Sequence, residues 1–590
     1  MSNFSEHLLE HRLSLSTVVQ ELNADGLLTD ADLARIGLST QLKVHPLVFL
    51  AEQHLSNAAV PGADLTMEKL LGWLGNRVDQ AVFRIDPLKI NVTAVADVMS
   101  KAFAERHRIL AVEVNDNEVV IASAEPFIQA WESNLEHVLR KPIRRVLTDP
   151  RDIVRHTGDF YSMAGSVRDA RTGDRSGSAA GLGNLEQMLE IGAMSEPDAN
   201  DQHIVKIVDW LLQYAFEQRA SDIHIEPRRE VGSVRFRIDG VLTTVYELPA
   251  QVCAAVSSRI KILGRMDVAE KRRPQDGRLK TRTPNGNEVE LRLATLPTAF
   301  GEKLVMRIFD PDVLQRSFEQ LGLTDEDLQH WHDMTSCGHG IVLVTGPTGS
   351  GKTTTLYSTL RELATPEVNV CTIEDPIEMV EAAFNQMQVN YGIDLGFSAG
   401  VRALMRQDPD IIMIGEIRDL ETANMAIQAA LTGHLVLSTL HTNDSPSSIS
   451  RLLELGAPAY LIRTTVRGIM SQRLVRILCA DCKDYSETDL DAWQQLTQPW
   501  DIEPPERIAR PVGCHKCRET GYVGRQGIYE VLVNSRAVQA QITPHLEIAK
   551  IREIAMDEGM RTLRVSGASR VARGETTIEE VMRVAPQVDV

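Results

Sequence analysis

The sequence predicts an α/β protein whose C-terminal half is built on a largely parallel sheet, and two observations support this. From about residue 320 onward, short apolar runs alternate with helical patterns, which is typical of a parallel sheet covered on both faces. One run, IVLVT (341–345), leads directly into the glycine-rich stretch GPTGSGKTT (346–354) and then into LYSTLRELA (356–364), which has a helical pattern. A strand, a glycine-rich loop and a helix in this order typically bind phosphate.

The loop at 346–354 satisfies the pattern G-x-x-x-x-G-K-[ST]. Its glycines let the backbone curl so that N–H groups face an anion. Lys352 is expected to reach the β- and γ-phosphates, and the hydroxyl of Thr353 to bind Mg²⁺. The loop therefore predicts a nucleoside triphosphate site, although not the use made of its energy. The residues predicted to contact the nucleotide are Gly346, Thr348, Gly349, Ser350, Gly351, Lys352, Thr353 and Thr354.

Size and composition indicate a multidomain globular protein. The chain has 590 residues, 43% of them hydrophobic, which corresponds to about three to five domains. Its net charge of −19 argues against a general polyanion binder. No apolar run approaches the roughly 18 residues that span a bilayer, and the start MSNFSEHLLEHRLS has no secretory signal. We therefore expect a cytosolic protein whose membrane role, if any, comes through a partner.

A segment rich in glycine, serine and charge, residues 162–186, predicts a flexible linker that we assign to 162–195. The linker separates an N-terminal module, 1–161, from the rest of the chain. We expect an α+β domain at 196–315 and the phosphate-binding α/β domain at 316–590.

The N-terminal module is expected to be a small α/β or α+β unit. Thr29 and Asp32 have capping-box spacing, so a helix should begin there. ILAVEV (109–114) and EVVIAS (118–123) flank an Asn-Asp-Asn turn and predict a hairpin, and KPIRRVLTDP (141–150) predicts another strand. The module shows no pattern that indicates chemistry.

The region after the linker opens with a predicted amphipathic helix and continues with strands. Alternating patterns predict strands at 221–227, 233–240, 287–296 and 302–309, with a helix at 252–264. The apolar face of the first helix is expected to comprise Ile204, Ile207, Val208, Leu211, Leu212 and Ala215.

Four of the seven cysteines form two C-x-x-C pairs that are typical of a tetrahedral zinc site. Because 31 residues lie between the pairs, a small inserted subdomain, about 476–520, must close the site. The alternatives are redox chemistry or free thiols, and His515 could replace one sulfur. The predicted structural zinc ligands are Cys479, Cys482, Cys514 and Cys517.

Acidic residues follow two predicted strands of the α/β domain. VNVCTIEDPIE (368–378) ends in Glu374, Asp375 and Glu378, and DPDIIMIGEIRD (408–419) places Glu416 directly after an apolar strand. Ligands bind at the carboxyl ends of strands in open α/β sheets, so these carboxylates are candidates to organise Mg²⁺ or water. An acidic turn and a solvated loop charge are the alternatives.

Two histidines bracket a further strand in TGHLVLSTLHTND (432–444). Either histidine alone is more often a core or surface residue. Together, His434 and His441 are candidates for sensing the γ-phosphate, because imidazole can donate to phosphate and report through its second nitrogen.

These four stretches, in this order, resemble the Walker A, Asp box, atypical Walker B and His box of the secretion ATPase superfamily. The resemblance is to the type II secretion and type IV pilus assembly ATPases, and it covers roughly 200–590. SDIHIEP, PQDGR, LPTAFGEK and the tetracysteine insertion are also family-like, whereas the pilus retraction branch lacks the insertion. Extension or secretion is therefore favoured. Residues 12–33 only faintly resemble a cyclic-dinucleotide-binding repeat, so that ligand is not predicted.

The resemblance implies a hexameric, RecA-like ATPase with nucleotide held between that domain and the smaller, PAS-like α+β domain. It implies that Glu416 is the Walker B glutamate, that Glu378 helps to position water, and that Arg292 and Arg307 reach the γ-phosphate. Both arginines lie on predicted strands, where alternation could point them at a cleft; surface charges are the alternative. Other family-like arginines are Arg402, Arg406, Arg418 and Arg451.

The implied function is ATP-driven polymerisation of pilins or pseudopilins at the inner membrane. The N-terminal module would dock on an inner-membrane platform protein and its cytoplasmic adaptor, without direct insertion into the membrane. One alternative is a DNA-uptake or conjugation motor, for which the cluster Lys271-Arg272-Arg273 is the best support, although the acidic net charge makes nucleic acid an unlikely partner. Another is a regulatory switch that barely hydrolyses ATP. Pilus and secretion systems are not distinguished at this point.

Overall fold

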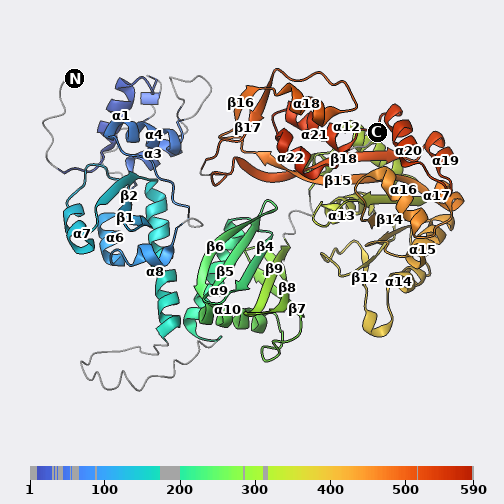
Figure 1. Ribbon diagram of the computed structural model, residues 1–590, viewed down its shortest axis with the longest axis horizontal. Helices are drawn as coiled ribbons and strands as arrows, with labels where there is room; N and C mark the ends of the chain where they lie inside the picture. Colours follow the sequence, from blue (N-terminus) through green and yellow to red (C-terminus); the bar gives the residue numbers. More distant parts are fainter. Residues whose placement is uncertain are drawn as a thin grey trace. The chain divides into compact units, whose positions relative to one another are not determined.

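The computed structural model describes residues 10–29, 32–33, 36, 44–53, 55, 65–86, 90–172, 199–283, 286–309, 316–514 and 516–587. Contacts between residues divide the chain into two units, Met1–Ile308 and Phe309–Val590. Figure 1 shows the first unit in blue to green and the second in yellow to red. Each unit is described by itself.

The N-terminal part of the first unit combines helices with a three-stranded sheet of order β1-β2-β3. β1 and β2 form the predicted antiparallel hairpin, and β3 pairs in parallel with β2. The capping pair is also present, because Asp32 N donates to Thr29 Oγ1 and Thr29 N to Asp32 Oδ2. The helix predicted to begin here lies largely outside the described residues. The elements are α1 (Leu15–Ala24), α3 (Pro46–Glu52), α4 (Met67–Val78), α5 (Val92–Ala96), α6 (Lys101–His107), β1 (Ile109–Val114), β2 (Val119–Ser123), α7 (Glu132–Leu139), β3 (Ile143–Leu147) and α8 (Pro150–Thr172).

Helix α8 corrects the predicted linker, since it continues to Thr172 through residues expected to be irregular. Phe160, Met163, Ala164 and Val167 are all buried in the core of this unit. Their spacing of three, one and three residues is that of one helical face. The glycines and serines nearby hid this pattern. The remainder of the expected linker, 173–195, lies outside the described residues.

The rest of the first unit is an antiparallel-rich sheet of order β6-β5-β4-β9-β8-β7 with two helices. The predicted apolar face of α9 is buried as expected. β6 and β7 were not predicted, because VLTTVYELP and QDGRLKTR lack a clean alternation of apolar and polar residues. The elements are α9 (Gln202–Glu217), β4 (Asp222–Pro227), β5 (Val231–Ile238), β6 (Val241–Pro249), α10 (Ala250–Leu263), β7 (Gln275–Arg282), β8 (Glu288–Thr298) and β9 (Gly301–Phe309).

The second unit is built on a seven-stranded sheet of order β12-β11-β13-β14-β10-β15-β18. All neighbouring strands are parallel except β15 and β18, which confirms the predicted parallel-rich sheet. The strands are β10 (Gly340–Thr345), β11 (Val370–Glu374), β12 (Asn385–Gln388), β13 (Ile411–Ile414), β14 (Leu435–Leu440), β15 (Val466–Leu478) and β18 (Tyr522–Val533).

Helices cover both faces of this sheet, because successive strand residues enter different cores. On β10, Ile341 and Leu343 belong to one core, and Val342 and Val344 to the other. This alternation is the physical basis of the uninterrupted apolar strands in the sequence. The helices are α11 (Phe318–Leu321), α12 (Asp325–Thr335), α13 (Lys352–Leu363), η2 (Tyr391–Ile393), α14 (Phe397–Leu404), α15 (Leu420–Leu431), α16 (Ser445–Glu454), α17 (Ala459–Thr465), α19 (Arg536–Gln541), α20 (Ile548–Asp557), α21 (Leu563–Ala572) and α22 (Ile578–Val584).

The cysteine insertion lies between β15 and β18. It contains the two-stranded antiparallel sheet of β16 (Asp484–Glu487) and β17 (Arg507–Arg510), with α18 (Leu490–Thr497) between them. These elements form the small inserted subdomain that the spacing of the cysteines requires. No helix in the described ranges is both long and apolar enough to cross a membrane.

Candidate nucleotide site

The glycine-rich loop connects β10 to α13 at the carboxyl edge of the sheet, as its sequence predicts. Gly346, Gly349 and Gly351 have φ angles of 147°, 81° and 92°, a region that side chains other than glycine rarely adopt. α13 begins at Lys352, so its free N–H groups and its dipole face the loop. The backbone is therefore shaped for an anion.

Strand β15 supports this loop from beneath. A Cβ on Gly346 would lie 2.6 Å from the carbonyl oxygen of Gln472, and one on Gly351 would lie 2.7 Å from Gln472 Nε2. Gln472 is 1% exposed, and its Oε1 accepts a hydrogen bond of 2.8 Å from Thr355 Oγ1 on α13. Glycine is required here by close contact as well as by backbone angle.

Lys352 closes the loop on itself. Its Nζ donates to the carbonyls of Gly346 (2.8 Å) and Pro347 (3.1 Å). Burial lowers the pKa of Lys352 to about 8; nearby Glu416 opposes this shift and Arg473 adds to it. A partly desolvated ammonium whose hydrogen bonds in the described chain go to two carbonyls would gain strongly from an anion, so the residues present fit a nucleoside triphosphate.

Glu416 follows β13 and lies beside this lysine. Its side chain is 15% exposed, and it pairs with Arg418 and lies 3.6 Å (Oε2) from His441 Nε2. His441 follows β14 and hydrogen-bonds the backbone of Gly346. Burial and the positive charge of Lys352 lower the pKa of His441. β10, β13 and β14 thus bring a cation, a carboxylate and an imidazole together.

The Asp box is tied to α13 through Tyr357. Its hydroxyl lies 2.8 Å from Glu374 Oε2 and 3.1 Å from the carbonyl of Met379, and it accepts from Gln386 Nε2 (3.0 Å). Glu374 is 4% exposed and therefore serves in this buried network rather than as a free ligand. The half-buried Glu378 immediately precedes the anchored Met379.

His434 does not lie in this cluster, and its role in sensing the γ-phosphate stays a prediction. β10 and β14 are parallel, with Thr345 opposite Leu440 at the carboxyl edge and Gly340 opposite Leu435 at the other. His434 precedes Leu435, so the six residues of β14, about 20 Å, separate it from the site. Its Nδ1 lies 2.8 Å from the carbonyl of Ala429, which indicates a structural role.

The two predicted arginines lie on the polar face of the sheet in the first unit. Arg292 and Arg307 alternate with buried residues of β8 and β9, which the sequence pattern indicated. Arg307 Nε donates to Asp222 Oδ1 at 2.9 Å, while its side chain remains 57% exposed. Since they belong to the other unit, their role toward the nucleotide stays a prediction.

Of the other four arginines, Arg418 alone is recorded in the Glu416 cluster of the described chain. Arg402 lies 3.9 Å from Glu421, and Arg451 lies 3.3 Å from Glu454. Arg406 donates to the carbonyl of Arg402.

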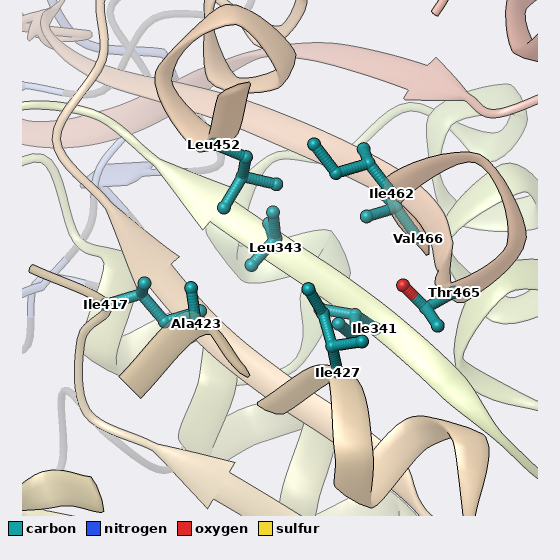
Figure 2. Close-up of a pocket in the computed structure, with 9 residues that line it drawn as sticks. All are labelled: Ile341, Leu343, Ile417, Ala423, Ile427, Leu452, Ile462, Thr465 and Val466. Carbon is teal, nitrogen blue, oxygen red and sulfur yellow. The ribbon is translucent and has the colours of Figure 1, made fainter. Parts of the chain in front are cut away.

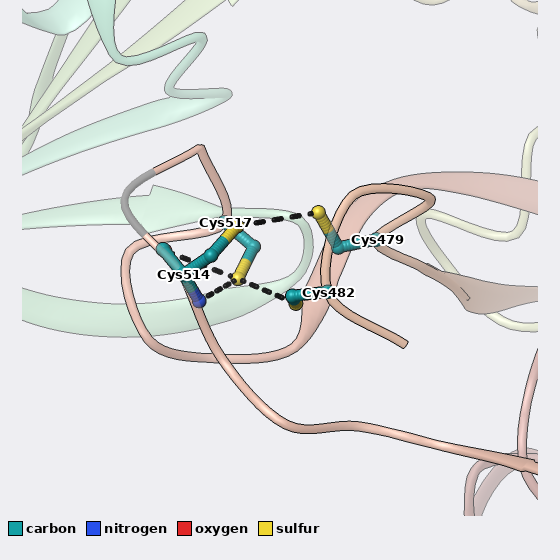
Figure 3. Close-up of side chains that lie close together, drawn as sticks. All are labelled: Cys479, Cys482, Cys514 and Cys517. Atoms are coloured by element: carbon teal, nitrogen blue, oxygen red, sulfur yellow. Dashed lines mark hydrogen bonds between the residues drawn. The ribbon is translucent and has the colours of Figure 1, made fainter. Parts of the chain in front are cut away.

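The four cysteine sulfurs converge as predicted, all within 4.8 Å of one another. Figure 3 shows the two pairs facing each other, with 3.6 Å between the sulfurs of Cys479 and Cys514 and 3.7 Å between those of Cys482 and Cys517. A tetrahedral ion with metal–sulfur bonds of about 2.3 Å places sulfurs about 3.8 Å apart. Backbone N–H groups donate to Cys482 and Cys517, which suits thiolates. The donor set therefore fits a closed metal site; His515 lies outside the described residues.

A small apolar pocket lies between β10 and helices α15 to α17. Figure 2 shows aliphatic side chains around it, with one hydroxyl, that of Thr465. That hydroxyl already donates to the carbonyl of Leu461. Without charged groups, this pocket does not suit a nucleotide.

The sequence analysis missed Tyr357, Gln472 and Arg473. The stretch SQRLVRI (471–477) did contain a signal, because the neighbouring polar residues Gln472 and Arg473 interrupt the alternation of polar and apolar residues. Their place beneath the loop depends on the pairing of β10 with β15, which lies more than 100 residues away.

A phosphate-binding loop at the carboxyl edge of a parallel sheet, with an acid and a histidine around its lysine, defines a P-loop nucleotide-binding protein. Residues 197–583 match the family described as "Type II/IV secretion system protein". Residues 78–167 match the MshEN domain, so the N-terminal region has a recognisable domain that the sequence analysis did not find; this match lies outside residues 12–33. The chain belongs to the type II/IV secretion system protein family, and its relatives include type IV pilus assembly ATPases and a type II secretion system protein, as the sequence resemblance implied.

Curated relatives match over most of their length. The type IV pilus assembly ATPase TfpB of Acinetobacter baylyi is 54% identical over 578 residues, covering 96% of this chain and 98% of the relative. The type IV pilus assembly ATPase PilB of Myxococcus xanthus is 39% identical, covering 83% and 86%. Type II secretion system protein E of Xanthomonas campestris is 40% identical, covering 82% and 84%.

Proposed function

We propose that this chain is an ATP hydrolase that drives type IV pilus assembly. The observation that carries the proposal is the convergence of Lys352, Glu416 and His441 at the carboxyl edge of three neighbouring parallel strands. Family membership supports ATP hydrolysis. The 54% identity to a pilus assembly ATPase over nearly the whole chain, against 40% to a secretion protein over less of it, favours the pilus.

In this proposal, Lys352 leaves the carbonyls of its own loop and binds the β- and γ-phosphates, so its buried charge gains a counter-charge. Glu416 orients the attacking water, and Glu378 assists from the segment anchored by Tyr357. His441 contacts the terminal phosphate and the loop. Mg²⁺, when bound next to Thr353, neutralises charge on the phosphates.

Arg292 and Arg307 are proposed to contact the γ-phosphate from the α+β domain. Hydrolysis would remove these contacts and let the two domains separate, which converts chemistry into motion. Arg307 would exchange its pairing with Asp222 for the γ-phosphate when ATP binds, and it would return to Asp222 after hydrolysis.

The working unit is proposed to be a cytoplasmic homo-hexamer at the inner membrane. The N-terminal module would dock on the platform protein and its adaptor, and the motor would then drive pilin polymerisation. The four cysteines are proposed to bind a structural Zn²⁺, because four thiolates fill all tetrahedral positions.

The proposal is tested in cells that lack this chain, by electron microscopy of surface pili. Wild-type protein should restore pili, while Lys352→Ala protein at equal abundance should not. Restored pili with Lys352→Ala would contradict an ATP-driven role. Loss of secreted proteins with normal pili would favour the secretion alternative. Turnover stimulated by DNA would favour a nucleic-acid motor. The structure gives that alternative little support, because Arg272 of the basic cluster is 89% exposed and pairs with Glu270.

A further inference from the structure

Arg473 is a buried arginine at the back of the phosphate loop. β15 runs parallel to β10, and Ser471 pairs with Thr345, the last residue of β10. Arg473 follows two residues later and therefore lies beside the loop at the carboxyl edge of the sheet. It is 5% exposed. A Cβ on Gly346 would lie 2.9 Å from its Nη1, which places the guanidinium directly against the loop backbone.

Its hydrogen bonds leave its charge unneutralised. Nη1 donates to the carbonyl of Gln472 (3.0 Å) and Nη2 to that of Asn443 (2.8 Å). Throughout the described chain, no carboxylate is recorded within the 4.0 Å salt-bridge distance of Arg473. Two carbonyls could be bridged equally well by a neutral amide. The buried charge therefore needs a separate explanation, because burying an ion without a salt bridge is unfavourable.

The nearest acids are already engaged. Asp444 caps α16 through Ser447 N (2.8 Å) and pairs with Arg552 (2.9 Å). Glu530 accepts from Ser445 N (2.7 Å), and burial raises its pKa to about 7, so it is only partly ionised at neutral pH. Both carboxylates raise the pKa of Arg473 through space, but burial outweighs them and the net shift is downward, and no salt bridge joins either acid to Arg473 in the described chain.

Arg473 also acts on the lysine of the loop, since its positive charge helps to lower the pKa of Lys352. Two like charges are thus held near each other in a desolvated place. This arrangement is unfavourable alone and becomes favourable when a multiply charged anion binds between them.

We propose that Arg473 is a phosphate-binding residue, whose guanidinium supplies the second cation for the terminal phosphates of the nucleotide beside Lys352. This inference rests on the proposed ATP site and deepens it. It predicts that Arg473 favours ATP over ADP, because the γ-phosphate carries the additional charge.

The test compares ATP and ADP affinities of purified full-length wild type, Arg473→Gln and Arg473→Lys, measured by displacement of a fluorescent nucleotide with Mg²⁺. Arg473→Gln should weaken ATP binding about tenfold or more and ADP binding less, and Arg473→Lys should recover part of the difference. If Arg473→Gln does not fold, Arg473→Met, which keeps apolar volume, provides the same comparison.

Arg467 is a matched control on the same strand. Arg467 packs against Gly340 at the opposite edge of the sheet, in the same way that Arg473 packs against Gly346. Its Nε donates to the carbonyl of His339 (3.0 Å). Arg467→Gln should bind both nucleotides as wild type does.

Equal weakening of ATP and ADP, without recovery in Arg473→Lys, would show that Arg473 only supports the loop and would overturn the inference. Unchanged ATP binding in Arg473→Gln would do the same while leaving the ATP site intact. Failure of the wild type itself to bind ATP would instead refute the proposed function, and the inference with it.

Discussion

Glu416 and His441 end neighbouring parallel strands, β13 and β14, and lie 3.6 Å apart between Oε2 and Nε2. Both side chains interact electrostatically with Lys352, which starts the helix after the third strand, β10. The parallel neighbours β13, β14 and β10 are distant in sequence, and their pairing places Glu416 and His441 beside the glycine-rich loop. The same order separates the two histidines of the His box.

Substitution of His441 and of His434 should therefore change the rate of ATP hydrolysis to different extents. His441→Ala is expected to lower kcat for ATP hydrolysis at least tenfold, because it removes the imidazole beside Glu416. His434→Ala should leave the kcat of the isolated chain within about twofold, since its ring contacts Ala429 at the other edge. Steady-state ATPase rates of both variants check this. Equal loss in both would contradict the placement.

Above pH 8, Lys352 should take up a proton when the nucleotide binds. The pKa of Lys352 is lowered to about 8 without nucleotide, and phosphate should raise it again. As pH rises through 8, the free lysine loses its proton and affinity should fall by up to tenfold per unit. Calorimetry at pH 8.5 in buffers of different ionisation enthalpy measures this uptake. Lys352→Arg stays charged and should show none; identical uptake in that variant would assign the proton elsewhere.

The tetracysteine cluster should hold one metal ion per chain. Cys514→Ser is expected to abolish bound zinc and lower the melting temperature, because the site closes the segment between β15 and β18. Elemental analysis and thermal unfolding measure both. Cys337→Ser, outside the cluster, should retain the metal. A full complement of zinc in Cys514→Ser would disprove the assigned ligands.

The hydrogen bonds of the Tyr357 hydroxyl to Glu374 and Met379 should matter for the rate of ATP hydrolysis. Tyr357→Phe removes a hydroxyl that contacts Glu374 and Met379, and should destabilise the domain by about 1–3 kcal/mol. It should also lower kcat more than it raises KM, because Glu378 loses its anchored neighbour. Tyr529→Phe, a buried tyrosine bonded to the carbonyl of Leu321, controls for loss of a hydroxyl. An equal loss of kcat in Tyr357→Phe and Tyr529→Phe would argue against a specific role of the Tyr357 hydroxyl in turnover.

Local sequence patterns predicted much of this arrangement. IVLVT, the glycine loop and the following helix appear at the expected residues, and Glu416 lies beside Lys352. The sequence put His434 and His441 at the two ends of one strand, and the direction of β14 in the sheet shows that His441 lies at the edge of the loop and His434 at the opposite edge.

Other features required tertiary information. Arg473 reaches the loop only through the pairing of β15 with β10, and the hydroxyl of Tyr357 meets Glu374 only after α13 packs on β11. Helix α8 is different, since the spacing of Phe160, Met163, Ala164 and Val167 was available in the sequence and was obscured by glycine and serine.

The most direct measurement of the central claim is a single-turnover assay of Glu416→Gln. The variant keeps size and polarity but lacks the charge beside Lys352. We expect it to bind ATP with Mg²⁺ at least as tightly as wild type and to cleave it at least 100-fold more slowly. Cleavage at the wild-type rate would show that Glu416 does not activate water and would contradict the site described here.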